Sequence, residues 1–249
     1  MRRPAATCPA LLAALALGGC ATATAAGDAP SVAPLRAALA AGFQAASAHG
    51  SATAAPTPFP EPPPPPPAAP PAWRSVAAGK PYAGRLLRGV QLPAHGPHHL
   101  TWDAVLDRSP NRGWRRWGTD RLVATIQAVA AAHRAAHPDA PPVLVADLSR
   151  PRGGVFDARF GGLGHASHQN GLDVDIQYPR KDRLPIGPRR PADVDRRLAQ
   201  DLVDRFVAAG AEFVFVGLRV RLKGPASVVQ PIAHHDDHLH VRLRRLPRR

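Results

Sequence analysis

The organisation of this chain follows from the stretch GHASHQNGLDVDI, residues 164–176. In the second half of the stretch, apolar residues alternate with Asp173 and Asp175. A period of two is the pattern of a half-buried strand, so both carboxylates are predicted to leave the same face of that strand.

The stretch HHDDHLHV, residues 234–241, repeats this arrangement. His238 and His240 alternate with apolar residues and are expected on one strand face. Two such strands side by side would offer imidazole and carboxylate ligands to one ion, with His168 reaching it from the loop before the first strand. Neutral imidazoles plus a carboxylate, with one position left for water, suit Zn²⁺.

Residues 1–26 have the pattern of an export signal, with basic Arg2 and Arg3, an apolar run and then small residues. The apolar run is too short to span a membrane. Cys20 follows Leu-Gly-Gly, as at a lipoprotein processing site, and we predict that it becomes a lipidated N-terminus that anchors the protein to the membrane. The alternative is an ordinary signal peptide cleaved between residues 21 and 26.

Residues 27–72 are rich in Ala and Pro, with an unbroken proline run from Pro62 to Pro67. Such a segment is expected to be a disordered tether whose proline tract is extended and semi-rigid. A spacer that lets the domain reach away from a membrane and a passive filler remain equally possible roles. The catalytic domain is predicted over residues 73–249.

Cysteine content and charge limit the chemistry of this domain. The chain has two cysteines, Cys8 and Cys20, and both lie in the export segment, so any metal must bind to His and Asp. The formal net charge of +14 favours polyanionic partners. For an exported protein, an anionic cell envelope is a simpler partner than nucleic acid, and no nucleic-acid partner is predicted.

Apolar spacing predicts two helices, one after an N-cap at Thr119 and one from Asp193 to Ala209. His133 and His137, near the end of the first helix, are assigned structural or surface roles. Short strands are predicted within 82–92, 143–146, 213–218 and 239–243. We therefore expect an α+β fold, with helices packed on a small, mainly antiparallel sheet that carries the ligands.

The spacing of His168 and Asp175, followed at a distance by His238 and His240, resembles a known group of metallopeptidases. This group contains the D-alanyl-D-alanine carboxypeptidases, the hedgehog fold and the penicillin-insensitive murein endopeptidases. The resemblance covers about residues 73–243. The murein endopeptidase branch is indicated by two stretches, SHQNGLDVDI at 167–176 and HDDHLHVR at 235–242.

The resemblance implies that His168, Asp175 and His240 bind zinc. It also implies that His238 acts as general base or stabilises the tetrahedral intermediate. The residues themselves agree with these roles, because no glutamate lies near the motifs and a His or Asp must accept the proton of a zinc-bound water.

Four further residues are candidates for the site. His165 could contact metal, in a second position or otherwise, or only line the cleft. His235 is expected at the rim, where it could orient substrate or donate to the oxyanion. Asp173 is predicted to hold a ligand imidazole by its other N–H. Arg150 could bind a substrate carboxylate or be a solvated turn residue.

What the resemblance implies as function is a periplasmic or cell-envelope zinc endopeptidase. Its substrate would be the cross-bridge between D-alanine and meso-diaminopimelate in peptidoglycan stem peptides. The chain has neither Ser-x-x-Lys nor Gly-x-Ser-x-Gly, which argues against an acyl-serine route. A D-Ala-D-Ala carboxypeptidase and a non-catalytic murein-binding protein remain alternatives. The number of metal ions, the oligomeric state and the role of the Arg-rich C-terminus are left open by the sequence.

Overall fold

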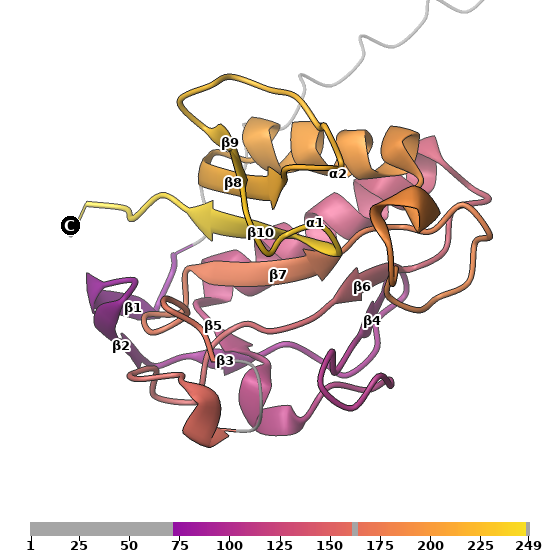
Figure 1. The fold of residues 1–249 in the computed structure, drawn as a ribbon. Helices are drawn as coiled ribbons and strands as arrows, with labels where there is room; N and C mark the ends of the chain where they lie inside the picture. The colour runs from indigo at the N-terminus through magenta and orange to yellow at the C-terminus, as the bar shows by residue number, and fades with distance from the viewer. Residues whose placement is uncertain (1–71, 161–163, 248–249) are drawn as a thin grey trace, which may run out of the picture. The chain divides into compact units, whose positions relative to one another are not determined.

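The computed structural model describes residues 72–160 and 164–247. The predicted export signal, the lipidation of Cys20 and the tether lie outside these residues. In the part described, a six-stranded sheet has the order β4-β6-β7-β10-β8-β9, and two further sheets pair β1 with β2 and β3 with β5 (Figure 1). The strands of the large sheet are β4 (His99–Thr101), β6 (Val143–Val145), β7 (Asp173–Gln177), β10 (His238–Leu243), β8 (Ala211–Gly217) and β9 (Val229–Ile232). The small sheets contain β1 (Val76–Lys80), β2 (Ala83–Leu87), β3 (Val90–Gln91) and β5 (Trp117–Gly118).

The middle of the large sheet is antiparallel, from β6 through β7 and β10 to β8. Its two outer pairings, β4 with β6 and β8 with β9, are parallel. Together with two helices, this arrangement confirms the predicted small α+β fold.

The first helix forms where its N-cap and apolar spacing predict it. α1 (Asp120–Ala136) follows Thr119, whose hydroxyl accepts a hydrogen bond from the Leu122 amide at 3.1 Å. The predicted start of the second helix at Asp193 is wrong by three residues. Residues 191–193 form a short 3₁₀ turn, and Asp195 then caps α2 (Arg196–Ala208).

Both helices cover the same face of the sheet (Figure 1). The apolar residues of the central strands point into this layer and are fully buried, and so are the inward residues of the helices. Removing this apolar surface from water stabilises the fold. The shared core includes Val174, Ile176, Val214, Leu239 and Val241 from the strands, and Leu122, Ile126, Leu198, Leu202 and Phe206 from the helices.

Strand register brings the polar alternates together on the opposite face. His240 is the Cα partner of Asp175 on one side and of Phe215 on the other. Arg242 is likewise flanked by Asp173 and Phe213. Directly paired residues of antiparallel strands have Cβ atoms about 5 Å apart, so their side chains must interact.

The expectation that β7 is half-buried is wrong, because all five of its residues are buried. The loop before β7 folds over the polar face: His165 Nδ1 lies 3.6 Å from Asp175 Oδ2, and His168 Nε2 lies 3.3 Å from Asp175 Oδ1. The carboxylates of Asp173 and Asp175 are therefore enclosed, and their side chains are 0% and 6% exposed.

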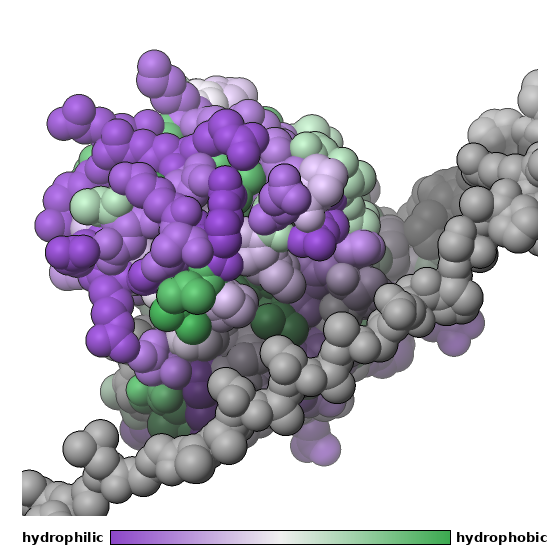
Figure 2. Space-filling model, turned by 90° about the vertical axis from the view of Figure 1, so that its right-hand side faces the viewer, coloured by the Kyte–Doolittle hydropathy of each residue, from purple (hydrophilic) through white to green (hydrophobic). Residues whose placement is uncertain are grey.

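Part of the positive charge is paired with carboxylates of the same chain. Figure 2, which looks onto the right-hand side of Figure 1, shows a mostly hydrophilic surface. The arginines that follow β7 form local ion pairs: Arg180 with Asp182, Arg183 with Asp195, Arg189 with Asp107 and Arg190 with Asp193. Within the described ranges, no helix is both long enough and apolar enough to cross a membrane.

Candidate metal centre

Three side-chain atoms from different segments converge on the polar face of the sheet. His168 Nε2 lies 3.3 Å from His240 Nδ1 and 3.3 Å from Asp175 Oδ1, and the last two atoms are 3.2 Å apart. Asp175 Oδ1 is buried and makes no well-aligned hydrogen bond within the described part of the chain. A buried carboxylate oxygen without such a bond calls for another partner, and two nitrogens and one oxygen in a tight triangle could hold one metal ion.

The outer nitrogen of each imidazole is held by an acceptor. His168 Nδ1 donates to the Leu148 carbonyl at 2.5 Å. His240 Nε2 donates to Asp173 Oδ1 at 2.8 Å. These bonds assign the proton of the neutral ring to the outer nitrogen and leave the inner nitrogen with its lone pair facing the triangle.

His168 has an unusual backbone conformation for its residue type. Its φ is +64°, in the left-handed region that side chains other than glycine rarely adopt. Gly171, three residues later, has a φ of +76°, and a Cβ there would lie 2.7 Å from the Leu86 side chain. Strained conformations of this kind persist where the surroundings enforce them, often at functional sites.

The charge balance of the group favours exchange of a proton for a metal cation. Burial lowers the pKa of His168, so its ring is neutral near pH 7. Burial also opposes protonation of His240, but the carboxylates of Asp173 and Asp175 outweigh it and raise the pKa of His240 to about 9. Without a metal, His240 therefore carries the compensating positive charge, and metal binding would displace that proton.

His238 stands beside the triangle with one nitrogen free to act. Its Nδ1 donates to Asp237 Oδ1 at 2.8 Å, and its Nε2 lies 3.8 Å from Asp175 Oδ1. Burial lowers the pKa of His238, but Asp175 and Asp237 together shift it above its ordinary value. His235 is next outward: its ring lies 4.7 Å from that of His238, and its Nδ1 donates to the Ala233 carbonyl.

His165 connects the triangle to a buried ion pair that the sequence analysis did not identify. Its Nε2 lies 2.8 Å from Asp147 Oδ2, and its Nδ1 lies 3.6 Å from Asp175 Oδ2. Arg115, which is 1% exposed, donates its Nε to Asp147 Oδ1 at 2.6 Å. Burial raises the pKa of Asp147, but bonds from Arg115 and His165 hold it well below its usual range.

Arg150 is not brought to the triangle by any contact among the described residues. Its guanidinium lies 3.6 Å from the centre of the Phe160 ring, and it donates a hydrogen bond to the Val155 carbonyl at 2.7 Å. Its predicted role in binding a substrate carboxylate stays a prediction.

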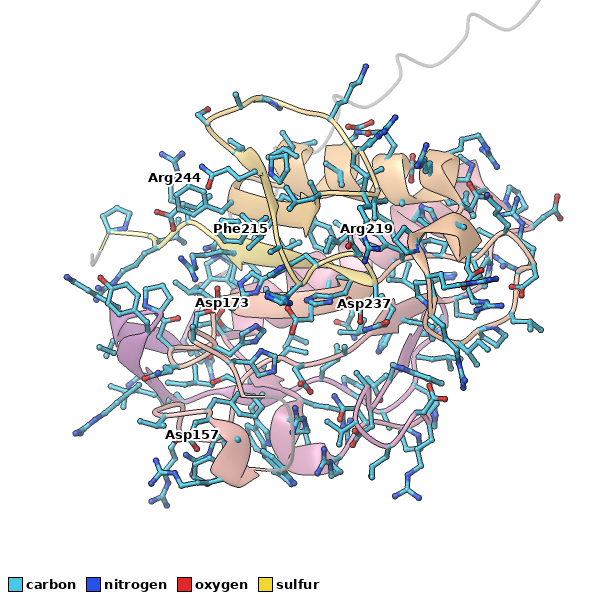
Figure 3. The ribbon with its side chains drawn as sticks, in the orientation of Figure 1. Asp157, Asp173, Phe215, Arg219, Asp237 and Arg244 are labelled. Carbon is cyan, nitrogen blue, oxygen red and sulfur yellow. The ribbon has the colours of Figure 1, made fainter. Side chains whose placement is uncertain are left out.

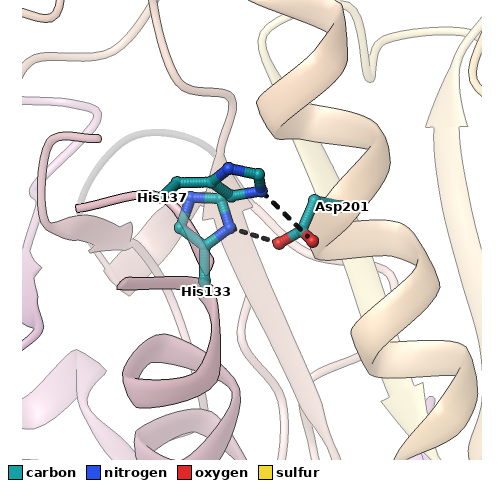
Figure 4. A group of neighbouring side chains, drawn as sticks. All are labelled: His133, His137 and Asp201. Atoms are coloured by element: carbon teal, nitrogen blue, oxygen red, sulfur yellow. Dashed lines mark hydrogen bonds and ion pairs between the residues drawn. The ribbon is translucent and has the colours of Figure 1, made fainter. Parts of the chain in front are cut away.

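A second His/Asp group lies between the helices (Figure 4). His133 Nδ1 is 2.6 Å from Asp201 Oδ2, and His137 Nε2 is 3.3 Å from Asp201 Oδ1. Arg205 binds both oxygens of the same carboxylate, at 2.6 and 2.9 Å. Arg197 reaches His137 Nδ1 at 3.1 Å. Arg205 already neutralises this carboxylate and occupies both of its oxygens, so the group is better explained as a clasp between α1 and α2 than as a metal site.

The central group therefore stands apart from the clasp. In Figure 3, Asp173, Phe215 and Asp237 mark the region where β7, β10 and β8 run side by side. Two imidazole nitrogens and a carboxylate oxygen meet there, and no arginine among the described residues binds the converging oxygen, Asp175 Oδ1.

Comparisons with known proteins agree on one family. The sequence model of the penicillin-insensitive murein endopeptidases matches residues 77–205. A penicillin-insensitive murein endopeptidase of Salmonella heidelberg (strain SL476) is 31% identical over an alignment of 156 positions, which covers 52% of this chain and 54% of that protein. One of Escherichia coli O157:H7 (strain EC4115) is 46% identical over 63 residues, 25% of this chain and 20% of that protein. The first match thus spans about half the length of its relative.

Proposed function

The chain belongs to the penicillin-insensitive murein endopeptidase family, and on that premise we propose that it is a zinc peptidase acting on peptidoglycan. The bond hydrolysed would be the cross-bridge amide between D-alanine and meso-diaminopimelate. The observation that carries this proposal is the triangle of His168, Asp175 and His240, with both imidazoles fixed by outer hydrogen bonds.

The spacing of the triangle supports zinc. Zinc–nitrogen and zinc–oxygen bonds are about 2.0–2.2 Å, and tetrahedral angles then separate two ligand atoms by about 3.3–3.5 Å. The three observed separations are 3.2–3.3 Å. Three protein ligands leave one tetrahedral position for water or substrate. When bound, zinc would polarise the substrate carbonyl and lower the pKa of a water to about 7.

The remaining residues would orient groups and move protons. His238, with Nδ1–H bound to Asp237, presents Nε2 toward the site and is our candidate for general base or for stabilising the tetrahedral intermediate. Asp173 would hold His240 in its ligating tautomer. His165 is proposed as an additional metal or substrate contact, and His235 as a substrate contact at the rim.

Family membership also supports a location in the cell envelope. We propose that the export signal delivers the enzyme to the periplasm, with lipid on Cys20 as its membrane anchor. Globomycin treatment of expressing cells tests the anchor: it should leave an unprocessed precursor, whereas processing by an ordinary signal peptidase would continue.

Digestion of purified muropeptides, with products identified by mass, tests the function. Zinc-loaded protein should convert cross-linked dimers to monomers, and a chelator should abolish the conversion. Loss of terminal D-alanine alone would indicate the carboxypeptidase instead. No product from a zinc-loaded, folded sample would refute both activities and leave a murein-binding role. Asp201→Asn, which alters only the helix clasp, is the matched control and should retain activity.

A further inference from the structure

The polar face of the sheet continues beyond the metal triangle onto β8, where it becomes aromatic. Phe213 and Phe215 occupy this face and are half-buried, whereas Val214 and Val216 point into the helix-covered core and are fully buried. The two rings stack with centroids 5.5 Å apart and planes 20° apart. Neither ring belongs to the hydrophobic core, so core packing does not explain the pair.

This aromatic pair adjoins the catalytic group directly. The Phe215 ring centroid lies 5.5 Å from that of His240 and 6.4 Å from that of His235. Phe213 lies two residues from Phe215 on β8 and is the Cα partner of Arg242. A ligand held at the triangle could therefore continue across Phe215 onto Phe213.

Arg242 adds positive charge beside the aromatic rings. Its Nε donates to Asp173 Oδ1 at 2.7 Å, which fixes the guanidinium next to His240. No described residue accepts a hydrogen bond from its two Nη groups, and the side chain is 15% exposed. An arginine held in this way can bind a carboxylate through its Nη groups.

We propose that Phe213, Phe215 and Arg242 form a shelf that binds the stem peptide next to the bond to be cleaved. This inference rests on the proposed function and assigns the subsite. Alanine and diaminopimelate present methyl and methylene groups, which suit the aromatic rings, and free carboxylates, which suit Arg242. The net charge of +14 is complementary to an anionic peptide. An uncharged sugar ring would make no use of the arginine.

Phe213→Ala is the decisive variant, because Phe213 lies two residue pairs away from the proposed ligand His240 in the register of β8 against β10. Removing a contact made equally in ground and transition states raises KM and leaves kcat unchanged. We expect KM for cross-linked muropeptide dimers to rise about five- to twentyfold, the range expected for loss of one partly buried aromatic contact. We expect kcat and zinc content to stay within about twofold. Tyr82→Ala removes a 57% exposed aromatic from the β1–β2 turn and should change none of these values.

Direct binding separates the shelf from the reaction. Calorimetry of the zinc-loaded protein with a soluble stem tetrapeptide, and separately with peptide-free glycan strands, needs no turnover. The shelf predicts weaker tetrapeptide binding by Phe213→Ala and by Arg242→Gln, with partial recovery in Arg242→Lys.

Each outcome of these measurements decides the proposal. Unchanged tetrapeptide affinity in Phe213→Ala, or no binding by the wild type, overturns the shelf even if hydrolysis is normal. Weakened glycan binding with unchanged peptide binding overturns the assigned ligand class. The wild type could bind the tetrapeptide but hydrolyse nothing, while Phe213→Ala binds it more weakly. That result supports the shelf and refutes the proposed activity.

Discussion

Asp173→Asn tests how the metal triangle is held in place. Asp173 is fully buried, and its Oδ1 accepts bonds from His240 Nε2 at 2.8 Å and from Arg242 Nε at 2.7 Å. Asparagine keeps the shape and one acceptor oxygen but removes the negative charge. Its NH₂ group would also replace Oδ2, which is buried and has no hydrogen-bond partner among the described residues.

The magnitude follows from these two bonds. Bonds to a charged group contribute about 1.5–3 kcal/mol, against about 0.5–1.5 kcal/mol for neutral pairs, so each bond should lose about 1–1.5 kcal/mol. The bond to His240 acts on metal binding, because it fixes the tautomer that presents Nδ1. We therefore expect zinc affinity to fall about 5- to 12-fold, equivalent to about 1–1.5 kcal/mol.

Competition with a chromophoric zinc chelator at pH 7.5 measures this change, with circular dichroism to confirm folding. Asp201→Asn is the matched control, since it removes a carboxylate that also contacts a histidine, in the clasp. It should leave both zinc affinity and stoichiometry unchanged. A folded Asp173→Asn protein with wild-type zinc affinity would refute the positioning role. A loss of one bound zinc in Asp201→Asn would show that the clasp is a metal site.

Three further predictions follow from the same contacts. His238→Gln should retain zinc while muropeptide hydrolysis falls about 10²- to 10⁴-fold, the range for loss of a general acid or base; loss of zinc as well would identify His238 as a ligand. Arg115→Met should lower the free energy of unfolding in urea by about 3–5 kcal/mol because it removes the arginine that is paired with the buried Asp147 carboxylate. Arg189→Met removes one partner of an exposed ion pair with Asp107 and should change the same free energy by less than about 1 kcal/mol. Acidification should weaken the clasp. Burial lowers the pKa of His133 below 6.5, although Asp201 opposes this shift. Burial raises the pKa of Asp201, but Arg205 and His133 outweigh it and lower that pKa from 3.8 to about 2. Because both pKa values are lowered in the folded state, stability present at higher pH is lost as the groups are protonated. The free energy of unfolding of the wild type should therefore fall more steeply between pH 7 and pH 5 than that of His133→Gln. Parallel profiles of the two proteins would contradict this.

Local patterns predicted the elements that carry the ligands, because alternation and capping are properties of a few adjacent residues. The faces of Asp175 and His240 followed from a period of two, and the start of α1 followed from Thr119. The enclosure of β7 did not follow, because it depends on a loop that folds back over the strand. Strands as short as β4 and β5 hold too few residues to produce a periodic signal.

Contacts between distant segments had no local signature. Arg115 and Asp147 are 32 residues apart, and nothing near Arg115 marks it as a buried cation. The pairing of Phe213 with Arg242 depends on the register of β8 against β10, which sequence patterns on separate strands do not specify. The convergence of His168, Asp175 and His240 needed less information, because two motifs and the assumption that their strands are neighbours were enough to predict it.

The two His/Asp groups show why residue type alone does not identify a metal site. The clasp has His133 in the last turn of α1 and His137 four residues later at its C-cap, a local spacing that favours shared coordination at least as much as that of His168 and Asp175. The difference lies in the cations that each carboxylate meets. Arg205 occupies both oxygens of Asp201, whereas Asp175 Oδ1 is left to two imidazole nitrogens. A dication entering the clasp would have to displace an arginine, but in the triangle it would displace only the proton on His240. Sequence spacing indicates the Arg205–Asp201 pair, which lies four residues apart on α2. It does not indicate that His133 and His137 of another segment meet the same carboxylate, because that contact depends on how α1 and α2 pack.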